Sequence, residues 1–158
     1  MNPEEILTSL QNPRIKTLVR LRDRRDRDRE GQFVIEGFRE LSRAVEARLP
    51  LEAIFTCPEL YLGRSEAELI EAAKERCGAK AWHVSRDVFQ KVSYRDRPDG
   101  LIARAPKPDW GLGRWDSLLE ENGSDQPQIF IVAQSIEKPG NLGTLLRTAD
   151  AAAVTGLM

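Results

Sequence analysis

Histidine and cysteine are nearly absent from this chain of 158 residues, which limits the metal sites and redox chemistry it can support. The two cysteines, Cys57 and Cys77, lie far apart and outside any spacing typical of metal ligands. We therefore expect two reduced, buried thiols of the kind found in cytosolic proteins. The single histidine, His83, lies in a segment that alternates like a strand, so we predict a structural role for it and no metal site.

Long apolar runs are missing as well. No stretch approaches the ~18 residues that a membrane span requires, and the N-terminus lacks the basic start and apolar core of a signal peptide. With 41% hydrophobic and 31% charged residues, the composition predicts a soluble, cytoplasmic protein with no membrane partner. The net charge of −1 by itself gives no indication of nucleic-acid binding.

Strands and helices alternate through the N-terminal part of the chain. Apolar residues at helical spacing and a Ser65-x-x-Glu68 capping box indicate helices, while short β-branched or aromatic runs indicate strands. This alternation is typical of βαβ units, so we predict an α/β fold, a three-layer α/β sandwich with a mostly parallel sheet. The predicted helices cover residues 13–21, 38–49, 65–77 and 85–92, and the predicted strands cover 33–36, 51–57, 81–84 and 101–105.

A segment rich in proline and glycine separates this part from the C-terminal residues. Breakers such as Pro106, Pro108 and Pro127 interrupt regular structure, although residues 114–121 have the pattern of a short helix. We predict a first domain over residues 1–106, a linker over 107–127, and the beginning of a second domain over 128–158.

The C-terminal segment has a strand–loop–helix pattern. Residues 129–133 form a short apolar run that suits a strand buried on both faces, and Pro139-Gly140-Asn141 is expected to end it in a turn. Apolar residues then recur at helical spacing, and Asn141 or Thr144 is the predicted cap of this helix. The loop therefore lies where α/β sheets usually bind ligands.

Three motifs resemble one known family. The pattern Pro139-Gly140-Asn141-x-Gly143-x-x-x-Arg147-Thr148-Ala149-x-Ala151 resembles the first motif of the SpoU (TrmH-like) family of RNA ribose methyltransferases, which belongs to the SPOUT class. Asn12-Pro13-Arg14-Ile15-Lys16 and Gly31-Gln32-Phe33-Val34-Ile35-Glu36-Gly37 resemble the substrate-binding domain that precedes the catalytic domain in many SpoU proteins. The resemblance implies an N-terminal domain like certain ribosomal RNA-binding proteins, then the first strand–helix unit of a trefoil-knot domain.

The same resemblance implies RNA modification by transfer of a methyl group from S-adenosylmethionine to a ribose 2′-hydroxyl of rRNA or tRNA. It implies catalytic roles for Asn141, which would organise the site, and Arg147, which would contact an RNA phosphate. An arginine of ordinary pKa is a poor base at neutral pH, so we favour a positioning role for Arg147. Taken alone, either residue would be interpreted as a helix cap or a solvated side chain, and only the combined spacing favours function.

Basic residues concentrate between Asn12 and Arg29, where eight Lys or Arg accompany three Asp. This segment is either a solvated, self-paired stretch or an electrostatic track for RNA phosphates, and the resemblance favours the track. Two turns that carry arginine, 36–40 and 94–100, are further candidates, with Tyr94 as a surface on which a base could stack. The predicted RNA-binding residues are Arg14, Lys16, Arg22, Arg24, Arg25, Arg39, Arg95 and Arg97.

The later family motifs, which supply most of the S-adenosylmethionine pocket, are not found in this sequence. We therefore expect the complete family domain to bind the cofactor and to form a homodimer. The 158 residues alone are expected to be inactive, either as a fragment or as the product of a truncated gene. The alternative function is a non-catalytic RNA-binding module. A scaffold domain without an RNA role is a third and weaker possibility.

Overall fold

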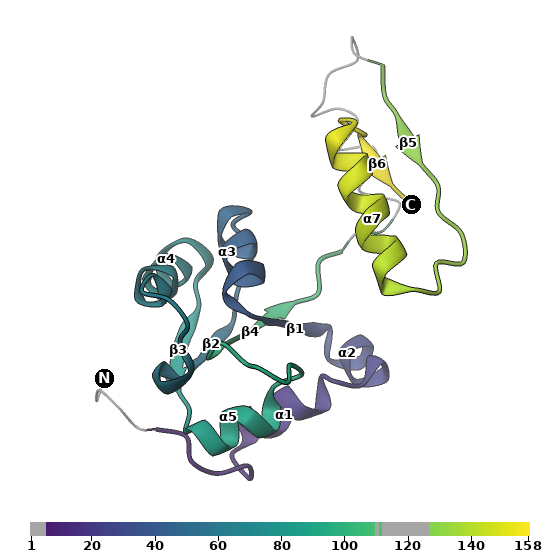
Figure 1. Ribbon diagram of the computed structural model, residues 1–158. Helices are drawn as coiled ribbons and strands as arrows, with labels where there is room; N and C mark the ends of the chain where they lie inside the picture. Colours follow the sequence, from purple (N-terminus) through teal and green to yellow (C-terminus); the bar gives the residue numbers. More distant parts are fainter. Residues whose placement is uncertain (1–5, 110, 112–126) are drawn as a thin grey trace. The chain divides into compact units, whose positions relative to one another are not determined.

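The chain forms two compact units, unit 1 over Met1–Pro108 and unit 2 over Asp109–Met158. The computed structural model describes residues 6–109, 111 and 127–158 (Figure 1). The helix predicted at 114–121 lies outside the described residues. In the part that is described, no helix has the length and apolar character needed to cross a membrane.

Unit 1 is built on a four-stranded sheet with the order β1-β4-β2-β3. β4 runs antiparallel to both of its neighbours, whereas β2 and β3 pair in parallel. The predicted α/β class is therefore confirmed, but the predicted mostly parallel sheet is wrong. The strands are β1 (Gln32–Glu36), β2 (Ala53–Thr56), β3 (Lys80–His83) and β4 (Leu101–Pro106).

The direction of β4 follows from the connection before it. The helices α3 (Phe38–Glu46) and α4 (Glu66–Cys77) follow β1 and β2 and carry the chain back along the sheet, so β1, β2 and β3 run in the same direction. After β3, a seven-residue helix and the loop 93–100 leave the chain at the carboxyl end of β2, so β4 enters the sheet from that end. Leu101, the first residue of β4, pairs with Thr56, the last residue of β2. The loop 93–100 and the turn after β1 consequently lie at the same end of the sheet.

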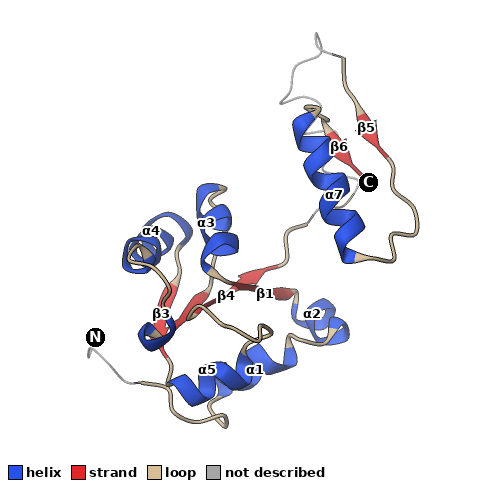
Figure 2. Ribbon diagram, in the orientation of Figure 1, coloured by secondary structure: helices blue, strands red, loops and turns tan. Residues whose placement is uncertain are grey.

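Helices cover both faces of this sheet (Figure 2). Alternate residues of β2 point to opposite faces, so Ile54 packs in a core with α3 and α4, and Phe55 packs in a second core with α1 and α5. Cys77 is buried in the first core and Cys57 in the second, and burial raises the pKa of both thiols. The helices are α1 (Pro13–Arg20), α3 (Phe38–Glu46), α4 (Glu66–Cys77) and α5 (Arg86–Val92).

The helix termini show which local signals were reliable. α1 begins as predicted, with Pro13 in its first turn and the Asn12 side chain accepting a hydrogen bond from the Arg14 backbone N–H at 2.9 Å. The predicted capping box of α4 is wrong, because the Ser65 side chain makes no cap hydrogen bond. The buried carboxylate of Glu66 instead accepts hydrogen bonds from the backbone N–H groups of residues 62 and 63. The charged stretch after α1 forms a short helix, α2 (Arg24–Glu30), capped by Asp23.

The described residues of unit 2 form a parallel strand pair and a long helix. β5 (Phe130–Ile131) pairs with β6 (Gly156–Leu157), and α7 (Pro139–Ala151) connects them. The predicted strand is present but shorter, and it is not buried on both faces, because Ile129 and Val132 are exposed. The helix begins at Pro139 with Lys138 as its N-cap, so Asn141 lies inside the first turn and caps nothing.

Candidate functional site

The loop 93–100, which joins α5 to β4, is fixed by side chains from two other elements. The Glu36 carboxylate, at the end of β1, accepts hydrogen bonds from the Ser93 hydroxyl and from the Tyr94 backbone N–H, the latter at 2.7 Å. The Arg22 guanidinium, between α1 and α2, donates to the carbonyl oxygens of Lys91 and Ser93, both at 2.8 Å. The predicted RNA-binding residue Arg22 therefore holds the loop in place.

Arg95 extends from this loop onto the turn after β1. Gly37 has a φ of 107°, and a Cβ at this position would lie 2.5 Å from the Arg95 guanidinium, so only glycine allows this approach. Arg95 Nη2 lies 2.7 Å from Glu40 Oε2, and Nη1 lies 3.7 Å from Asp99 Oδ2. Although desolvation opposes it, the hydrogen bond and charge of Glu40 raise the pKa of Arg95, which keeps this half-buried guanidinium charged.

A hollow of about 370 Å³ lies between this loop and the α1–α2 region, and we refer to it as the loop hollow. Tyr94 is 51% exposed as a residue, and the Arg22 guanidinium lies 5.0 Å from the centroid of its ring. An exposed ring with a cation beside it can stack on a base while a phosphate is held nearby. The residues that line the loop hollow are Leu21, Arg27, Phe33, Val34, Glu36, Tyr94 and Arg95.

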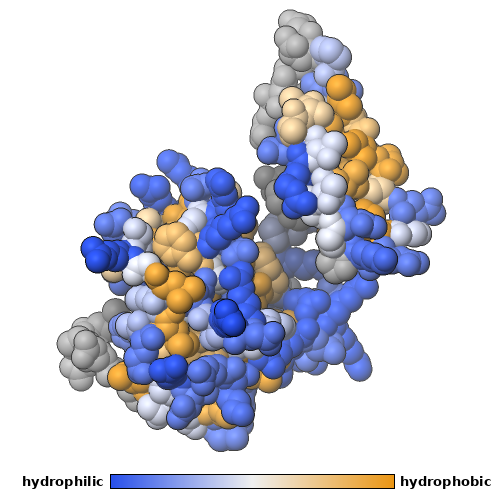
Figure 3. Space-filling view, in the orientation of Figure 1, coloured by the Kyte–Doolittle hydropathy of each residue, from blue (hydrophilic) through white to orange (hydrophobic). Residues whose placement is uncertain are grey.

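The other predicted RNA-binding residues are spread over unit 1. Arg24 pairs weakly with Asp28 across 3.6 Å and is almost fully exposed. Four of the predicted residues are exposed and make no ion pair, side-chain hydrogen bond or ring contact within the described part of the chain. These four are Lys16, Arg25, Arg39 and Arg97. Figure 3 shows the surface over α2 as hydrophilic, as expected from its alternating charges.

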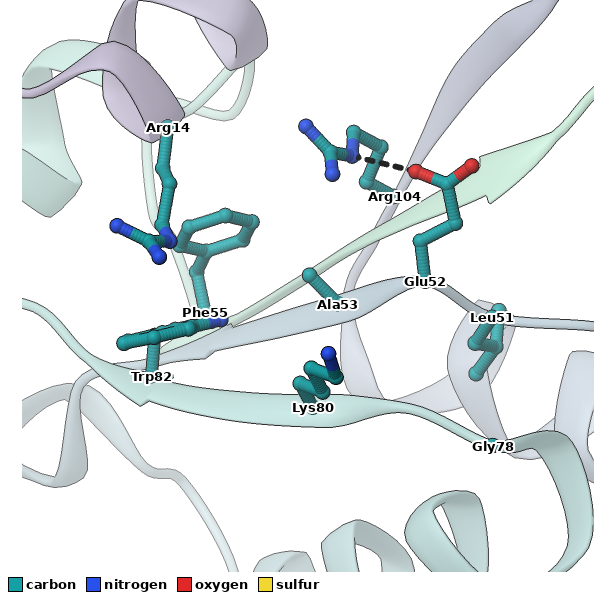
Figure 4. A pocket seen from close by; sticks show the side chains of 9 residues that line it. All are labelled: Arg14, Leu51, Glu52, Ala53, Phe55, Gly78, Lys80, Trp82 and Arg104. Carbon is teal, nitrogen blue, oxygen red and sulfur yellow. Dashed lines mark ion pairs between the residues drawn. The ribbon is translucent and has the colours of Figure 1, made fainter. Parts of the chain in front are cut away.

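Arg14 belongs to a separate hollow of about 510 Å³ on the α1–α5 side of the sheet, which we call the sheet hollow (Figure 4). Lys80, Trp82 and Arg104, which line it, were not predicted as site residues. Two sequence signals could have indicated them. Lys80 and Trp82 are two positions apart in a strand and so share a face, and Arg104 is the one cation in the otherwise apolar segment 101–105.

The candidate catalytic residues lie on α7 in unit 2. The exposed Arg147 side chain runs back toward the helix N-terminus, where Nη2 donates to Thr144 Oγ1 at 3.2 Å and Nη1 lies 3.4 Å from a Cβ built on Gly143. Asn141 lines an open hollow of about 390 Å³, but Arg147 does not. The structure thus places both residues on one helix without bringing their side chains into one described cavity.

The hollow beside Asn141 does not fit an adenosyl group. Its lining comes mainly from exposed polar residues of the segment 134–138, and Ile136 is its single aliphatic side chain. Ligand pockets of this kind normally enclose most of the ligand within apolar and aromatic side chains. This hollow therefore does not provide a pocket for S-adenosylmethionine.

His83 lies at the end of β3, where its Nδ1 is 3.1 Å from the hydroxyl oxygen of Thr56. This contact joins two neighbouring strands of the sheet. Among the residues that the structure describes, no group of three or more His, Cys, Asp or Glu side chains could hold a metal ion.

Comparison with known proteins gives a consistent set of similarities. Residues 12–103 match the family described as the MRM3-like substrate binding domain. The chain is 30% identical to an uncharacterized tRNA/rRNA methyltransferase of Synechocystis sp., over 96% of this chain and 51% of that protein. A crystal structure of an RNA 2′-O ribose methyltransferase superposes with a TM-score of 0.69 at 38% identity, over 96% of this chain and 54% of the other.

The fold is also shared with the SpoU methyltransferase AviRb of Streptomyces viridochromogenes, solved with the cofactor AdoMet. The TM-score is 0.73 at 23% identity, over 93% of this chain and 52% of that one. The chain thus spans about half the length of the relatives that it matches.

Proposed function

The chain belongs to the SpoU (TrmH-like) group of RNA 2′-O-methyltransferase relatives and carries their MRM3-like substrate-binding domain, and from this premise we propose that unit 1 binds an rRNA or tRNA substrate. The reaction served would be transfer of a methyl group from S-adenosylmethionine to a ribose 2′-hydroxyl. The observation that carries the proposal is the arrangement around the loop hollow. There a fixed loop presents an exposed tyrosine beside charged arginines, as a surface for single-stranded RNA requires.

The contacts of Arg95 support a role in shaping this surface. Its guanidinium is held by Glu40 and lies against Gly37, so the turn after β1 and the loop 93–100 form one rigid edge. Unpaired arginines flank this edge at positions 39 and 97. Rigid presentation lowers the entropic cost of binding, because fewer side chains must be ordered when RNA arrives.

In the catalytic domain, we propose that Arg147 orients an RNA phosphate and that Asn141 organises the surroundings of the reacting hydroxyl. A guanidinium offers a planar fork that suits a phosphate and positions it without accepting a proton. The hydrogen bond from Arg147 to Thr144 already directs this fork toward the start of α7. Homodimer formation through the complete catalytic domain remains a prediction.

A second candidate function is RNA binding without methyl transfer. One observation favours it: the hollow beside Asn141 in unit 2 does not fit an adenosyl group. A single assay separates the two candidates. The purified chain is incubated with total rRNA and tRNA and with S-adenosylmethionine labelled in its methyl group. Label in the RNA supports methyl transfer by this chain. RNA binding without label supports the non-catalytic RNA-binding module.

The binding proposal is tested by removing exposed cations that hold nothing else in place. In a triple variant, Arg25→Ala, Arg39→Ala and Arg97→Ala, we expect RNA affinity to fall about tenfold and the salt dependence of log K to lose about one unit per lost phosphate contact. The control carries Arg43→Ala, Lys74→Ala and Arg76→Ala, which remove equal charge from α3 and α4. Filter binding from 50 to 200 mM salt measures the affinity and its salt dependence for both triple variants. Equal losses of RNA affinity in the two triple variants would contradict the proposed RNA-binding function of unit 1.

A further inference from the structure

The sheet hollow has a regular construction that the loop hollow lacks. Ala53 of β2 pairs with Lys80 of β3 on one side and with Arg104 of β4 on the other, so a small side chain lies between two cations in one row across the sheet. The next row on this face contains Phe55, paired with Trp82. Figure 4 shows the cations and the indole ring surrounding the space above Ala53.

The charges around this space are mostly uncompensated. Lys80 is exposed, and within the described residues its ammonium group makes no ion pair or hydrogen bond. Arg104 Nε lies 3.0 Å from the Glu52 carboxylate, which also accepts two hydrogen bonds from the Gln32 side chain. Arg14 adds a third cation, so three positive charges face one carboxylate. The space therefore favours an anion.

The indole of Trp82 provides a planar surface beside these cations. The Arg14 guanidinium lies 3.9 Å from the centroid of the ring. Arg14 is located in the first turn of α1, whose start is fixed by the Asn12 cap, so the pair is placed by two separate elements. Bases of single-stranded RNA stack on aromatic rings and on guanidinium planes, whereas bases inside a duplex are already stacked and cannot enter such a space.

We propose that the sheet hollow is a nucleotide subsite for unpaired RNA. Lys80 and Arg104 bind a backbone phosphate above Ala53, and the adjoining base lies against the Arg14–Trp82 pair. Residues along one strand are about 3.3 Å apart, so Lys80 and Trp82 are separated by about the length of a nucleotide's sugar and phosphate. This inference rests on the proposed RNA-binding function and adds a second contact region to it, distinct from the loop hollow.

Trp82 can report on its own subsite. The chain has two other tryptophans, Trp110 and Trp115, so the variant Trp110→Phe/Trp115→Phe leaves Trp82 as the single indole. In this background we expect a fluorescein-labelled oligouridylate to quench tryptophan emission saturably, while anisotropy of the label measures total binding. Lys80→Glu should raise the midpoint of quenching about tenfold. Lys74→Glu, with the same charge change on α4, should leave the midpoint unchanged.

The outcomes separate this inference from the function on which it rests. Binding seen by anisotropy without any change in Trp82 emission would overturn the subsite and leave the proposed function in place. Absence of binding by either signal would overturn both. Equal quenching by an RNA duplex, or by uridine monophosphate at equal concentration, would overturn the assignment to unpaired RNA. Lys80→Gln, which removes the charge without reversing it, should give an intermediate midpoint with an unchanged thermal transition.

Discussion

At the scale of single residues, the turn that leads into β4 is tightly constrained. Gly100 has a φ of 80°, and its carbonyl oxygen accepts a hydrogen bond from the Cys57 backbone N–H at 2.9 Å. A Cβ on Gly100 would lie 2.5 Å from the Cys57 carbonyl oxygen and 2.8 Å from the Tyr61 ring. Tyr61 is itself partly buried, and desolvation raises the pKa of its hydroxyl. The loop 93–100 therefore enters the sheet through a position that only glycine can occupy.

Gly100→Ala should be much more destabilising than the same change at Gly31. Gly31 also has a positive φ, 61°, but nothing lies within 4 Å of an added Cβ, so its replacement costs only the left-handed conformation, about 1–2 kcal/mol. At Gly100 a steric clash with the backbone is added, for a total of about 3 kcal/mol or more. Urea unfolding followed by circular dichroism measures both variants. Equal losses of unfolding free energy would show that the backbone relaxes around the new methyl group.

At the scale of elements, local signals predicted where most helices and strands lie. Asn12 followed by Pro13 predicted the start of α1 correctly, because a side-chain cap and a fixed φ act within a few residues. Ser65 did not act as a cap, because the Glu66 carboxylate binds the preceding backbone instead. Only the direction of β4 departs from the predicted parallel arrangement, because the hydrophobic pattern of a strand is the same whichever way the strand enters the sheet.

Local sequence signals also predicted part of the candidate site, but not the contacts that depend on the fold. Exposed arginines in turns can be recognised along the chain, and Arg95 and Tyr94 do lie in a fixed loop beside a hollow. That Arg22 holds this loop, or that Lys80 and Arg104 flank Ala53, depends on strand order and register. Those pairings join residues distant in sequence, and one sequence without its fold does not reveal them.

The N-terminus of α3 depends on a residue from a distant element. Its N-cap is Gly37, which has no side chain to offer, and the Phe38 backbone N–H donates instead to Asp99 Oδ2 at 2.8 Å. Asp99→Ala should therefore cost about 2 kcal/mol of unfolding free energy, because the first turn of α3 loses its acceptor. Asp96→Ala, in the exposed part of the same loop, should change stability by less than about 0.5 kcal/mol. Thermal unfolding of both variants checks this, and similar transitions would exclude a capping role.

At the scale of the whole molecule, the two units differ in how much apolar surface they bury. Both hydrophobic cores consist of residues from unit 1. Among the described residues of unit 2, Ala149 is the one hydrophobic residue that is buried, while Val132 and Leu146 are 74% and 48% exposed. Figure 3 shows apolar side chains gathered on the surface beside α7 and β5.

The stability of the chain should therefore reside in unit 1. A chain ending at Pro108 should unfold with a midpoint within about 3 °C of the 158-residue chain, because it keeps every described residue of both cores. Differential scanning calorimetry of the two chains provides the comparison. A drop well beyond this range would mean that unit 2 stabilises the sheet domain, and RNA binding by the shorter chain could be measured in the same preparation.

The position of β4 in the sheet also affects how the protein can be made. β4 is the last strand of unit 1 to leave the ribosome, yet it occupies the place between β1 and β2. A nascent chain that has emerged only as far as α5 can pair β2 with β3, but β1 has no partner strand until residues 101–106 follow. Translation must therefore pass the Gly100 turn before the sheet can close, and the nascent domain until then exposes strand edges that chaperones recognise.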